Sequence, residues 1–383
     1  MKFDRRALKA LEILDKNGYS AYLVGGCVRD YLLGKAPGDY DIAVTCSPSG
    51  IKKAFAEYKQ ILTGEAYGTV TVVIEGLPLE ITSCRSEDGY NDSRHPSSVD
   101  FSADIRGDLS RRDFTVNAIA CDRYMNFTDP HGGENDLKNG IIRAVGEPQK
   151  RFGEDALRIL RGVRFCSVLG FEIENGTAQA MLKMKDGLNA VSRERVSAEI
   201  KKAAVGKNFG KALTLYGEIF SAAYKGFENF DINTVQAINR ADKDLKDFAF
   251  LCGFENTQTA AKDLFYQKAT VNKADFFKNN LLINHGNMRG FLKDANYEDM
   301  RLLLRLKDAF NIESTDEKSQ FEYIVQNRLC CKIGELAVSG NDIQMLGYSG
   351  EAVGKMLEKA LWLVTTKGIK NDKQTILSYL KKA

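Results

Sequence analysis

The chain has 383 residues, of which 44% are hydrophobic and 27% charged, and its formal net charge is +3. At roughly 100–200 residues per domain, this length predicts more than one domain, and the hydrophobic content is typical of a globular protein with a real core. The 6 prolines exclude long proline-rich linkers, and the small net charge does not by itself indicate a nucleic-acid binder.

The first 140 residues mix helical and extended patterns. Apolar residues at helical spacing predict a helix over 4–17, and a second helix over 28–33 that ends at Gly34. Short apolar runs between turn signals predict five strands, over 22–24, 40–44, 69–74, 79–82 and 116–121. We therefore expect a mixed α/β domain in this part of the chain.

From residue 151 onward the pattern is almost entirely helical. Amphipathic runs predict helices over 151–169, 177–185, 192–205, 207–216, 299–310 and 353–364. The last thirty residues carry seven lysines against two acidic residues. Such a basic end either follows a phosphate backbone or forms a solvated helix face, and the segment alone does not decide between the two.

The 8 cysteines contain no C-x-x-C pair and stand mostly in apolar contexts, which predicts reduced, buried thiols of a cytoplasmic protein. The first residues are charged and lack the apolar core of a signal peptide. No run reaches the 18 or so apolar residues that span a membrane. We therefore expect neither a targeting segment nor a membrane contact.

Two carboxylates stand where the 40–44 strand is expected to begin. Residues i and i+2 of a strand face the same side, so Asp39 and Asp41 are expected to project together. Paired like charges are costly unless a cation neutralises them, and hard divalent ions prefer oxygen ligands. Glu80, on the 79–82 strand, is the candidate third ligand. The alternative reading is an acidic pair in a surface turn.

The turn before these carboxylates predicts a phosphate contact. Gly25 and Gly26 follow the 22–24 strand and precede a helix, where glycines allow close backbone approach to a phosphate. Arg29 is placed to reach the same triphosphate. The chain lacks the G-x-x-x-x-G-K-[ST] pattern of a P-loop, and a paired-glycine turn is often only a turn.

The predicted 151–169 helix has one apolar and one polar face. At about 100° per residue, an arc of roughly 120° carries Glu154, Asp155, Arg158 and Arg161. Such a face is either an ion-pair network on a solvated helix or a recognition surface. A carboxylate accepts from the exocyclic amine of cytosine or adenine, and a guanidinium donates to the neighbouring ring acceptor. Guanine and uracil present a carbonyl instead of the amine, so this pair selects against them.

Four segments resemble the motifs of one family, in that family's order. They are Gly25-Gly26-x-Val28-Arg29-Asp30 with Asp39-x-Asp41, then Arg111-Arg112-Asp113-Phe114-Thr115-Val116-Asn117-Ala118, then Glu154-Asp155-Ala156-Leu157-Arg158, and finally Ser192-Arg193-Glu194-Arg195-Val196. The family is that of the tRNA nucleotidyltransferases, the CCA-adding enzymes of the bacterial class II type, and the bacterial poly(A) polymerases. The resemblance covers residues 20–205.

The resemblance implies an α+β fold with a polymerase-beta-like nucleotidyltransferase head, a mixed sheet with helices, and an elongated all-α neck, body and tail. We expect the head over residues 1–140, the neck with a nucleotide-selecting helix over 141–210, an RNA-binding body over 211–330 and a basic tail over 331–383. The implied reaction is template-independent addition of CCA to the 3′ end of tRNA from CTP and ATP, with two Mg²⁺ ions and release of pyrophosphate.

The resemblance also assigns roles to residues. It makes Asp39 and Asp41 metal ligands, Glu80 stays with them as the candidate third carboxylate, and the remaining candidates are given to the nucleotide. Arg112 offers a cation to a phosphate and Asp113 an acceptor to a ribose 2′-OH, while Asn117 helps to place the same sugar. The implied partners are the 3′ end and acceptor region of tRNA with CTP and ATP, and no protein partner is expected.

A polar segment over 85–108 resembles the family's flexible loop, with Tyr90, Asp92, Arg94 and Pro96 in the expected pattern. A complete loop favours full CCA addition over partial (CC- or A-) addition. A poly(A) polymerase stays possible because it shares the head, although the strongly basic extension usual there is short here. A non-catalytic RNA-binding module is a further alternative. None of the three histidines is followed by aspartate, which argues against a phosphohydrolase site.

Overall fold

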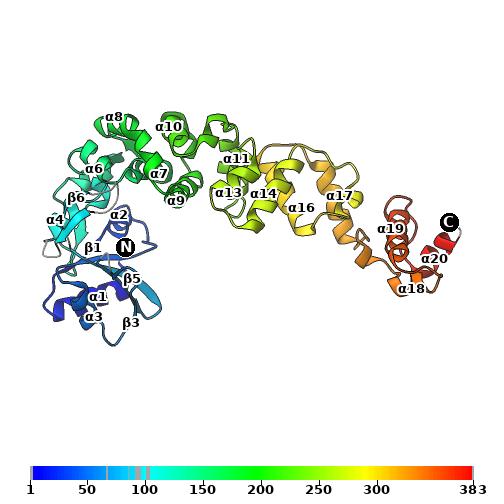
Figure 1. Ribbon diagram of the computed structural model, residues 1–383, viewed down its shortest axis with the longest axis horizontal. Coiled ribbons are helices and arrows are strands. Elements are labelled where there is room, and N and C mark those ends of the chain that lie inside the picture. Colours follow the sequence, from blue (N-terminus) through cyan, green and yellow to red (C-terminus); the bar gives the residue numbers. More distant parts are fainter. Residues whose placement is uncertain (1–2, 66–67, 85, 91–95, 101–103, 382–383) are drawn as a thin grey trace. The chain divides into compact units, whose positions relative to one another are not determined.

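The computed structural model describes residues 3–65, 68–84, 86–90, 96–100 and 104–381. The chain divides into two compact units, Met1–Asn229 and Phe230–Ala383 (Figure 1). The first unit contains a sheet followed by helices. The described part of the second unit contains helices and no strand.

A seven-stranded sheet is the centre of the first unit, in the order β3-β4-β5-β2-β1-β8-β9. The strands are β3 Lys59–Ile61, β4 Thr69–Ile74, β5 Leu77–Ser83, β2 Asp41–Val44, β1 Ala21–Val24, β8 Ala120–Cys121 and β9 Phe127–Thr128. Neighbours run antiparallel except β2 and β5, which are parallel. A parallel pair needs a crossover, and the chain makes it through α3 (Pro48–Ala54), β3 and β4.

Helices cover this sheet and fix its strands. Helix α1 (Arg5–Lys16) begins at Asp4, whose side chain accepts from the Arg6 N–H at 2.8 Å, and it packs against β1 and α3. Helix α4 (Ile105–Ser110) buries Ile105 and Leu109 in one cluster with Val24 of β1 and Ala43 of β2. Helix α4 therefore lies firmly against the strand that carries Asp41.

The strand predictions are confirmed for 69–74, and within two residues for 22–24, 40–44 and 79–82. The 116–121 strand is wrong in part, because Thr115–Asn117 forms a 3₁₀ turn and only Ala120–Cys121 pairs in the sheet. The Asp113 carboxylate accepts from the Phe114 N–H and from Asn117 Nδ2, and this local bonding favours the turn.

The segment predicted as a loop contains an antiparallel hairpin, β6 (Ser86–Tyr90) and β7 (Pro96–Asp100), followed by α4. The predicted loop residues Asp92 and Arg94 lie outside the described residues, so the loop reading stays a prediction.

Five helices follow the head in the first unit: α6 Pro148–Glu154, α7 Leu157–Leu169, α8 Asn175–Met184, α9 Arg193–Ala204 and α10 Phe209–Ala223. Helices α8 and α9 confirm two predictions. The single helix expected over 151–169 is wrong, because Asp155 is extended (φ −153°, ψ 102°) and separates α6 from α7. Its Oδ1 accepts from the Leu157 N–H at 3.1 Å, and its Oδ2 pairs with Arg195 at 2.7 Å. Aspartate side chains compete with helical bonding in this way.

The second unit holds helices α11 to α20, among them α16 Tyr297–Ala309, α17 Thr315–Gln326, α19 Glu351–Thr365 and α20 Lys373–Lys381. Helices α16 and α19 confirm the predictions over 299–310 and 353–364. A buried cluster from Cys330 to Leu380 gives the end of the chain a core of its own. None of the helices among the described residues is long and apolar enough to cross a membrane. All eight cysteines are free and buried, as predicted.

Candidate active site

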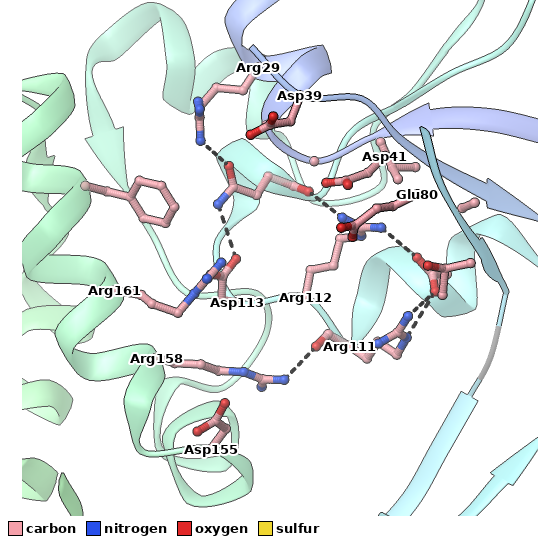
Figure 2. A pocket seen from close by; sticks show the side chains of 18 of the residues that line it. Arg29, Asp39, Asp41, Glu80, Arg111, Arg112, Asp113, Asp155, Arg158 and Arg161 are labelled. Carbon is pink, nitrogen blue, oxygen red and sulfur yellow. Dashed lines mark hydrogen bonds and ion pairs between the residues drawn. The ribbon is translucent and has the colours of Figure 1, made fainter. Parts of the chain in front are cut away.

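A cavity of about 790 Å³ in the first unit lies where the sheet meets α7 and α9. Figure 2 shows its labelled side chains in two groups, with Asp39, Asp41 and Glu80 on one side and Asp155, Arg158 and Arg161 on the other. Every predicted site residue lines this cavity except Glu154. Residues from four distant segments, around 25–41, 80, 108–117 and 155–202, are therefore brought together.

The carboxylates come from neighbouring strands. Asp41 of β2 is the register partner of Glu80 of β5. Asp39 lies in the bend before β2 and not in the strand, so strand alternation does not explain its position, although it lines the same cavity. Burial raises the pKa of Asp41, Glu80 and Asp39 add to this effect, and Arg112 opposes it. The three carboxylates therefore share one electrostatic environment.

The donor chemistry of this group suits a hard divalent ion. Across residues 3–65 and 68–84, neither Asp39, Asp41 nor Glu80 takes part in an ion pair. The part of the chain that the structure describes holds no ready-made cluster of three or more His, Cys, Asp or Glu ligands for a metal. Mg²⁺ is usually bound by one or two carboxylates together with substrate phosphates rather than by an all-protein cage. The residues present therefore fit a metal that arrives with a nucleotide.

Gly25 leaves room for the side chains of Arg112 and Asp41 to lie close to the backbone. Its φ of +71° is favourable for glycine, and it lies between β1 and α2 (Gly26–Leu32) as predicted. A Cβ at this position would lie 3.1 Å from Arg112 Nη1 and 3.5 Å from Asp41 Oδ2. The absence of a side chain therefore lets a guanidinium and a carboxylate approach the turn from both sides.

A series of hydrogen bonds between side chains of the cavity lining connects α2 to α7. Arg29 Nη1 donates to Asn117 Oδ1 at 2.9 Å, and Asn117 Nδ2 donates to Asp113 Oδ1 at 3.3 Å. Asp113 Oδ2 pairs with Arg161 at 2.6 Å. Burial alone would raise the pKa of Asp113, but Arg161, Arg158 and the Phe114 N–H outweigh it and hold that pKa at about 2. Asp113 is therefore a charged acceptor across the neutral pH range.

Asp108 anchors the two arginines of the next segment. Its side chain is 1% exposed; Oδ2 lies 3.0 Å from Arg112 Nη2, and Oδ1 accepts from Arg111 Nε at 3.0 Å. Burial alone would raise the pKa of Asp108, but Arg112 and Arg111 overcome this and lower it. The sequence interpretation missed this residue. With a helix recognised over 105–110, the i,i+3 and i,i+4 spacing to the arginines would have indicated it.

Asp155 and Arg158 are the two residues predicted to read the base. Asp155 lies at the break between α6 and α7, and Arg158 lies in the first turn of α7. Asp155 pairs with Arg195 of α9, while Arg158 Nη1 pairs with Glu154 at 2.7 Å and Arg158 Nη2 donates to the Arg111 carbonyl at 3.0 Å. Glu154 also pairs with Arg151 at 2.6 Å and is absent from the cavity lining. Because the helix is interrupted at Asp155, the single polar arc predicted for 154–161 does not form. Asp155, Arg158 and Arg161 still line the cavity.

Helix α9 supplies cavity residues that were not among the predicted site residues. Arg195, Glu199 and Lys202 follow one another along one face; Glu199 pairs with Arg164 of α7 at 2.7 Å, and Lys202 lines the cavity. Phe165 is 4% exposed and meets Phe114 edge to face, so it is a core residue, although it also borders the cavity. Lysine and arginine spacing along 195–202 is too common in solvated helices to have been a signal.

Two family models match the chain. Residues 21–143 match a poly A polymerase head domain, and residues 170–216 match a probable RNA and SrmB-binding site of polymerase A. The matches cover the sheet with its carboxylates and the helices α8 and α9.

Curated relatives point the same way. The CCA-adding enzyme of Anoxybacillus flavithermus is 42% identical over 220 residues, which are 57% of this chain and 55% of that protein, so the chain spans about half the length of this relative. The CCA-adding enzyme of Staphylococcus haemolyticus is 33% identical over 403 aligned positions, which cover 98% of this chain and 97% of that protein.

Among solved structures, the Bacillus stearothermophilus CCA-adding enzyme in complex with CTP has a TM-score of 0.82 at 30% identity and covers 99% of this chain and 96% of its own. A tRNA nucleotidyltransferase complexed with a primer tRNA and an incoming ATP analog has a TM-score of 0.63 at 27% identity, over 83% of this chain and 98% of its own. With a relative matched over nearly its full length, the chain belongs to the family of CCA-adding enzymes.

Proposed function

We propose that this protein adds CCA to the 3′ end of tRNA without a nucleic-acid template, using CTP and ATP and releasing pyrophosphate. The observation that carries the proposal is that one cavity holds both the acidic residues of the sheet and two further residues, Asp155 at the break before α7 and Arg158 on α7. The relatives named CCA-adding enzyme, and the similar structure in complex with CTP, support the same activity.

We infer that Asp39 and Asp41 hold two Mg²⁺ ions, with Glu80 as a further acidic contact. Held by these residues, divalent ions would lower the pKa of the attacking RNA hydroxyl and neutralise the triphosphate. The terminal 3′-OH of tRNA attacks the α-phosphate in line, and pyrophosphate leaves. The chain's own contribution is to position the two substrates, and no side chain needs to act as a general base.

Asp155 and Arg158 read the base in this proposal. Each carboxylate oxygen of Asp155 accepts one protein hydrogen bond and keeps a lone pair for the amine of cytosine or adenine. Arg158 uses both Nη1 hydrogens and one Nη2 hydrogen on protein acceptors, so Nε–H and one Nη2–H are left to reach a base. Glu154 and Arg195 then act by orienting this pair rather than by touching the nucleotide.

The remaining predicted contacts concern the sugar and the phosphates. Asp113 stays charged and is held by Asn117 and Arg161, which suits an acceptor for the ribose 2′-OH. Arg112 lies beside Gly25 and Asp41. In the proposal, the triphosphate bound to the metal lies next to this guanidinium. Gly25, Gly26 and Arg29 line the same wall of the cavity.

The division into head, neck, body and tail at residues 140, 210 and 330 is also a proposal. The separate buried cluster between Cys330 and Leu380 supports the tail, whereas the boundary between the two compact units follows Asn229 rather than residue 210. We propose that body and tail bind tRNA through its backbone. The eight free, buried thiols support a reducing compartment, which we take to be the cytoplasm.

Product length on tRNA tests the proposal. The purified protein receives Mg²⁺ and a tRNA that ends at the discriminator base, with CTP alone, ATP alone or both, and with the Asp41→Ala variant as the inactive control. Growth by two nucleotides with CTP and by three with both, followed by a stop, is the expected result. A stop at two with both nucleotides means a CC-adding enzyme, and long ladders from ATP alone mean a poly(A) polymerase.

The role of Asp155 has its own prediction. Asp155→Ala removes the acceptor for the exocyclic amine, so discrimination against UTP and GTP is expected to fall by roughly 10²-fold or more, while tRNA binding changes little. The measurement is kcat/KM for each of the four nucleotides on one tRNA. Asp186→Ala, an acidic residue outside the cavity lining, is the matched control. Unchanged discrimination in Asp155→Ala would refute base reading by this residue.

A further inference from the structure

Asp108 lies beside the proposed metal ligands but points at arginines instead of into the acidic group. It is buried on α4, and α4 is packed through Ile105 and Leu109 against Val24 and Ala43 of the two central strands. Ala43 is two residues from Asp41 on β2. The Asp108 carboxylate is therefore fixed relative to the strand that carries Asp41.

Arg112 depends on Asp108 for its position. Its Nη2 lies 3.0 Å from Asp108 Oδ2, whereas its Nη1 makes a long 3.4 Å hydrogen bond to the Asn117 carbonyl. Its Nε is buried and meets no hydrogen-bond partner within the described residues. The ion pair to Asp108 is the strongest of these contacts, because charge-assisted hydrogen bonds are shorter and about twice as strong as neutral ones.

Asp41 is the competing partner for Arg112. A Cβ on Gly25 would touch both groups, at 3.1 Å from Arg112 Nη1 and 3.5 Å from Asp41 Oδ2, so the guanidinium and the carboxylate face each other across this glycine. Arg112 favours the charged form of Asp41, as an attracting neighbour does. In the part of the chain that the structure describes, however, the ion pairs of Arg112 go to Asp108 and not to Asp41.

We propose that Asp108 is a positioning residue that holds the Arg112 guanidinium away from Asp41, so that the carboxylates stay open to divalent ions. The inference rests on the proposed function and adds a residue to which no role has been given. Without the negative charge at 108, Arg112 swings across Gly25 and pairs with Asp41. A metal ion must then displace a cation before it binds.

The test is direct metal binding. Asp108→Asn keeps the shape of the side chain and removes its charge. Mn²⁺ is titrated into full-length protein saturated with CTP, without RNA, and free Mn²⁺ is followed by electron paramagnetic resonance. Wild-type protein and Asp104→Asn are expected to bind alike, because Asp104 is an exposed helix cap four residues away and asparagine caps equally well. Asp108→Asn is expected to bind Mn²⁺ about tenfold more weakly. The reason is that a positive charge beside a carboxylate changes the binding of another cation by that carboxylate about tenfold or more.

A double variant separates this role from a merely structural one. Asp108→Asn/Arg112→Gln removes the cation that lies across Gly25 from Asp41, so the affinity for Mn²⁺ is expected to return to within about twofold of wild type, even though nucleotide addition stays impaired. Equal loss in the single and double variants would mean a folding defect and would overturn the proposal. So would an unchanged affinity in Asp108→Asn. Wild-type protein that binds CTP but no Mn²⁺ would instead refute the proposed metal-dependent function, and the inference with it.

Discussion

At the scale of single residues, the site depends on the absence of a side chain at Gly25. Gly25→Ala places a methyl group between Arg112 and Asp41 and strains a backbone with φ +71°. We expect a stability loss of about 1–3 kcal/mol from the backbone, and a fall in nucleotide addition of roughly 10²-fold because the two groups are pushed apart. The measurement combines thermal unfolding with initial rates on tRNA.

Gly76→Ala is the control for this prediction. Gly76 has φ +80° at the turn between β4 and β5, and a Cβ there would meet nothing within 4 Å. It should lose comparable stability and keep its rate. Equal rates for both variants would show that close packing at Gly25 does not matter for the chemistry.

The pKa of Asp113 gives a pH prediction at the same scale. It lies at about 2 against an ordinary value of 3.8, so the group stabilises the fold above pH 3.8 and this contribution is lost as the pH falls through about 2. The shift corresponds to about 2 kcal/mol. In urea unfolding, wild type and Asp113→Asn should therefore converge in stability by this amount as the pH falls from about 4 to 2. Parallel pH profiles would contradict the strong pairing with Arg161.

At the scale of elements, one buried ion pair joins α16 to α17. Lys307 and Glu317 are each 1% exposed and lie 2.7 Å apart, and Lys307 also donates to the Ile283 carbonyl. Glu317→Gln leaves a buried ammonium without its counter-ion and should cost about 3–5 kcal/mol. Far-ultraviolet circular dichroism during urea unfolding, which follows the helices of this unit, measures the change.

The same two helices provide the comparison. Lys318 and Asp308 form an ion pair between them at the surface, with side chains 37% and 52% exposed. Asp308→Asn should cost less than about 1 kcal/mol, because water screens exposed pairs. Similar losses in both variants would mean that burial does not control the strength of these contacts.

The sequence predicted elements well where local pattern decides them. The alternation Thr-Val-Thr-Val-Val-Ile over Thr69–Ile74 needs no distant information, and neither does the amphipathic α16. It failed at Asp155, which interrupts the helix and pairs with Arg195, forty residues away. It also failed at Asp39, which reaches the cavity from a bend rather than from a strand. The motifs gave most of the cavity lining, whereas Asp108, Glu199 and the pairing of Arg195 with Asp155 required the fold.

At the scale of the whole molecule, charge is unevenly distributed along the chain. Residues 331–383 hold eight lysines and five acidic residues, which accounts for the entire formal charge of +3. If this tail contacts a phosphate backbone, the variant with Lys355, Lys359 and Lys367 changed to glutamine should bind tRNA more weakly. The slope of log affinity against log salt should fall by about 2. Filter binding over a KCl series measures this.

The control removes as much charge from the head, in a variant with Lys53, Lys59 and Lys138 changed to glutamine. These residues lie outside the cavity lining, and their loss should leave the salt slope unchanged. Equal slopes for the tail variant and wild type would mean that the tail lysines form only a solvated face.

The eight buried thiols allow the local opening of each unit to be followed by their chemical reactivity. Cys27, Cys46, Cys84, Cys121 and Cys166 lie in the first unit, and Cys252, Cys330 and Cys331 in the second. Burial raises their pKa values, to about 11 for Cys27 and about 12 for Cys252, so a folded chain resists alkylating reagents. Each thiol therefore reacts at the rate at which its surroundings open. Pulse alkylation read by mass spectrometry would map the stability of the catalytic sheet and of the helical end separately, in one unlabelled, unmodified protein.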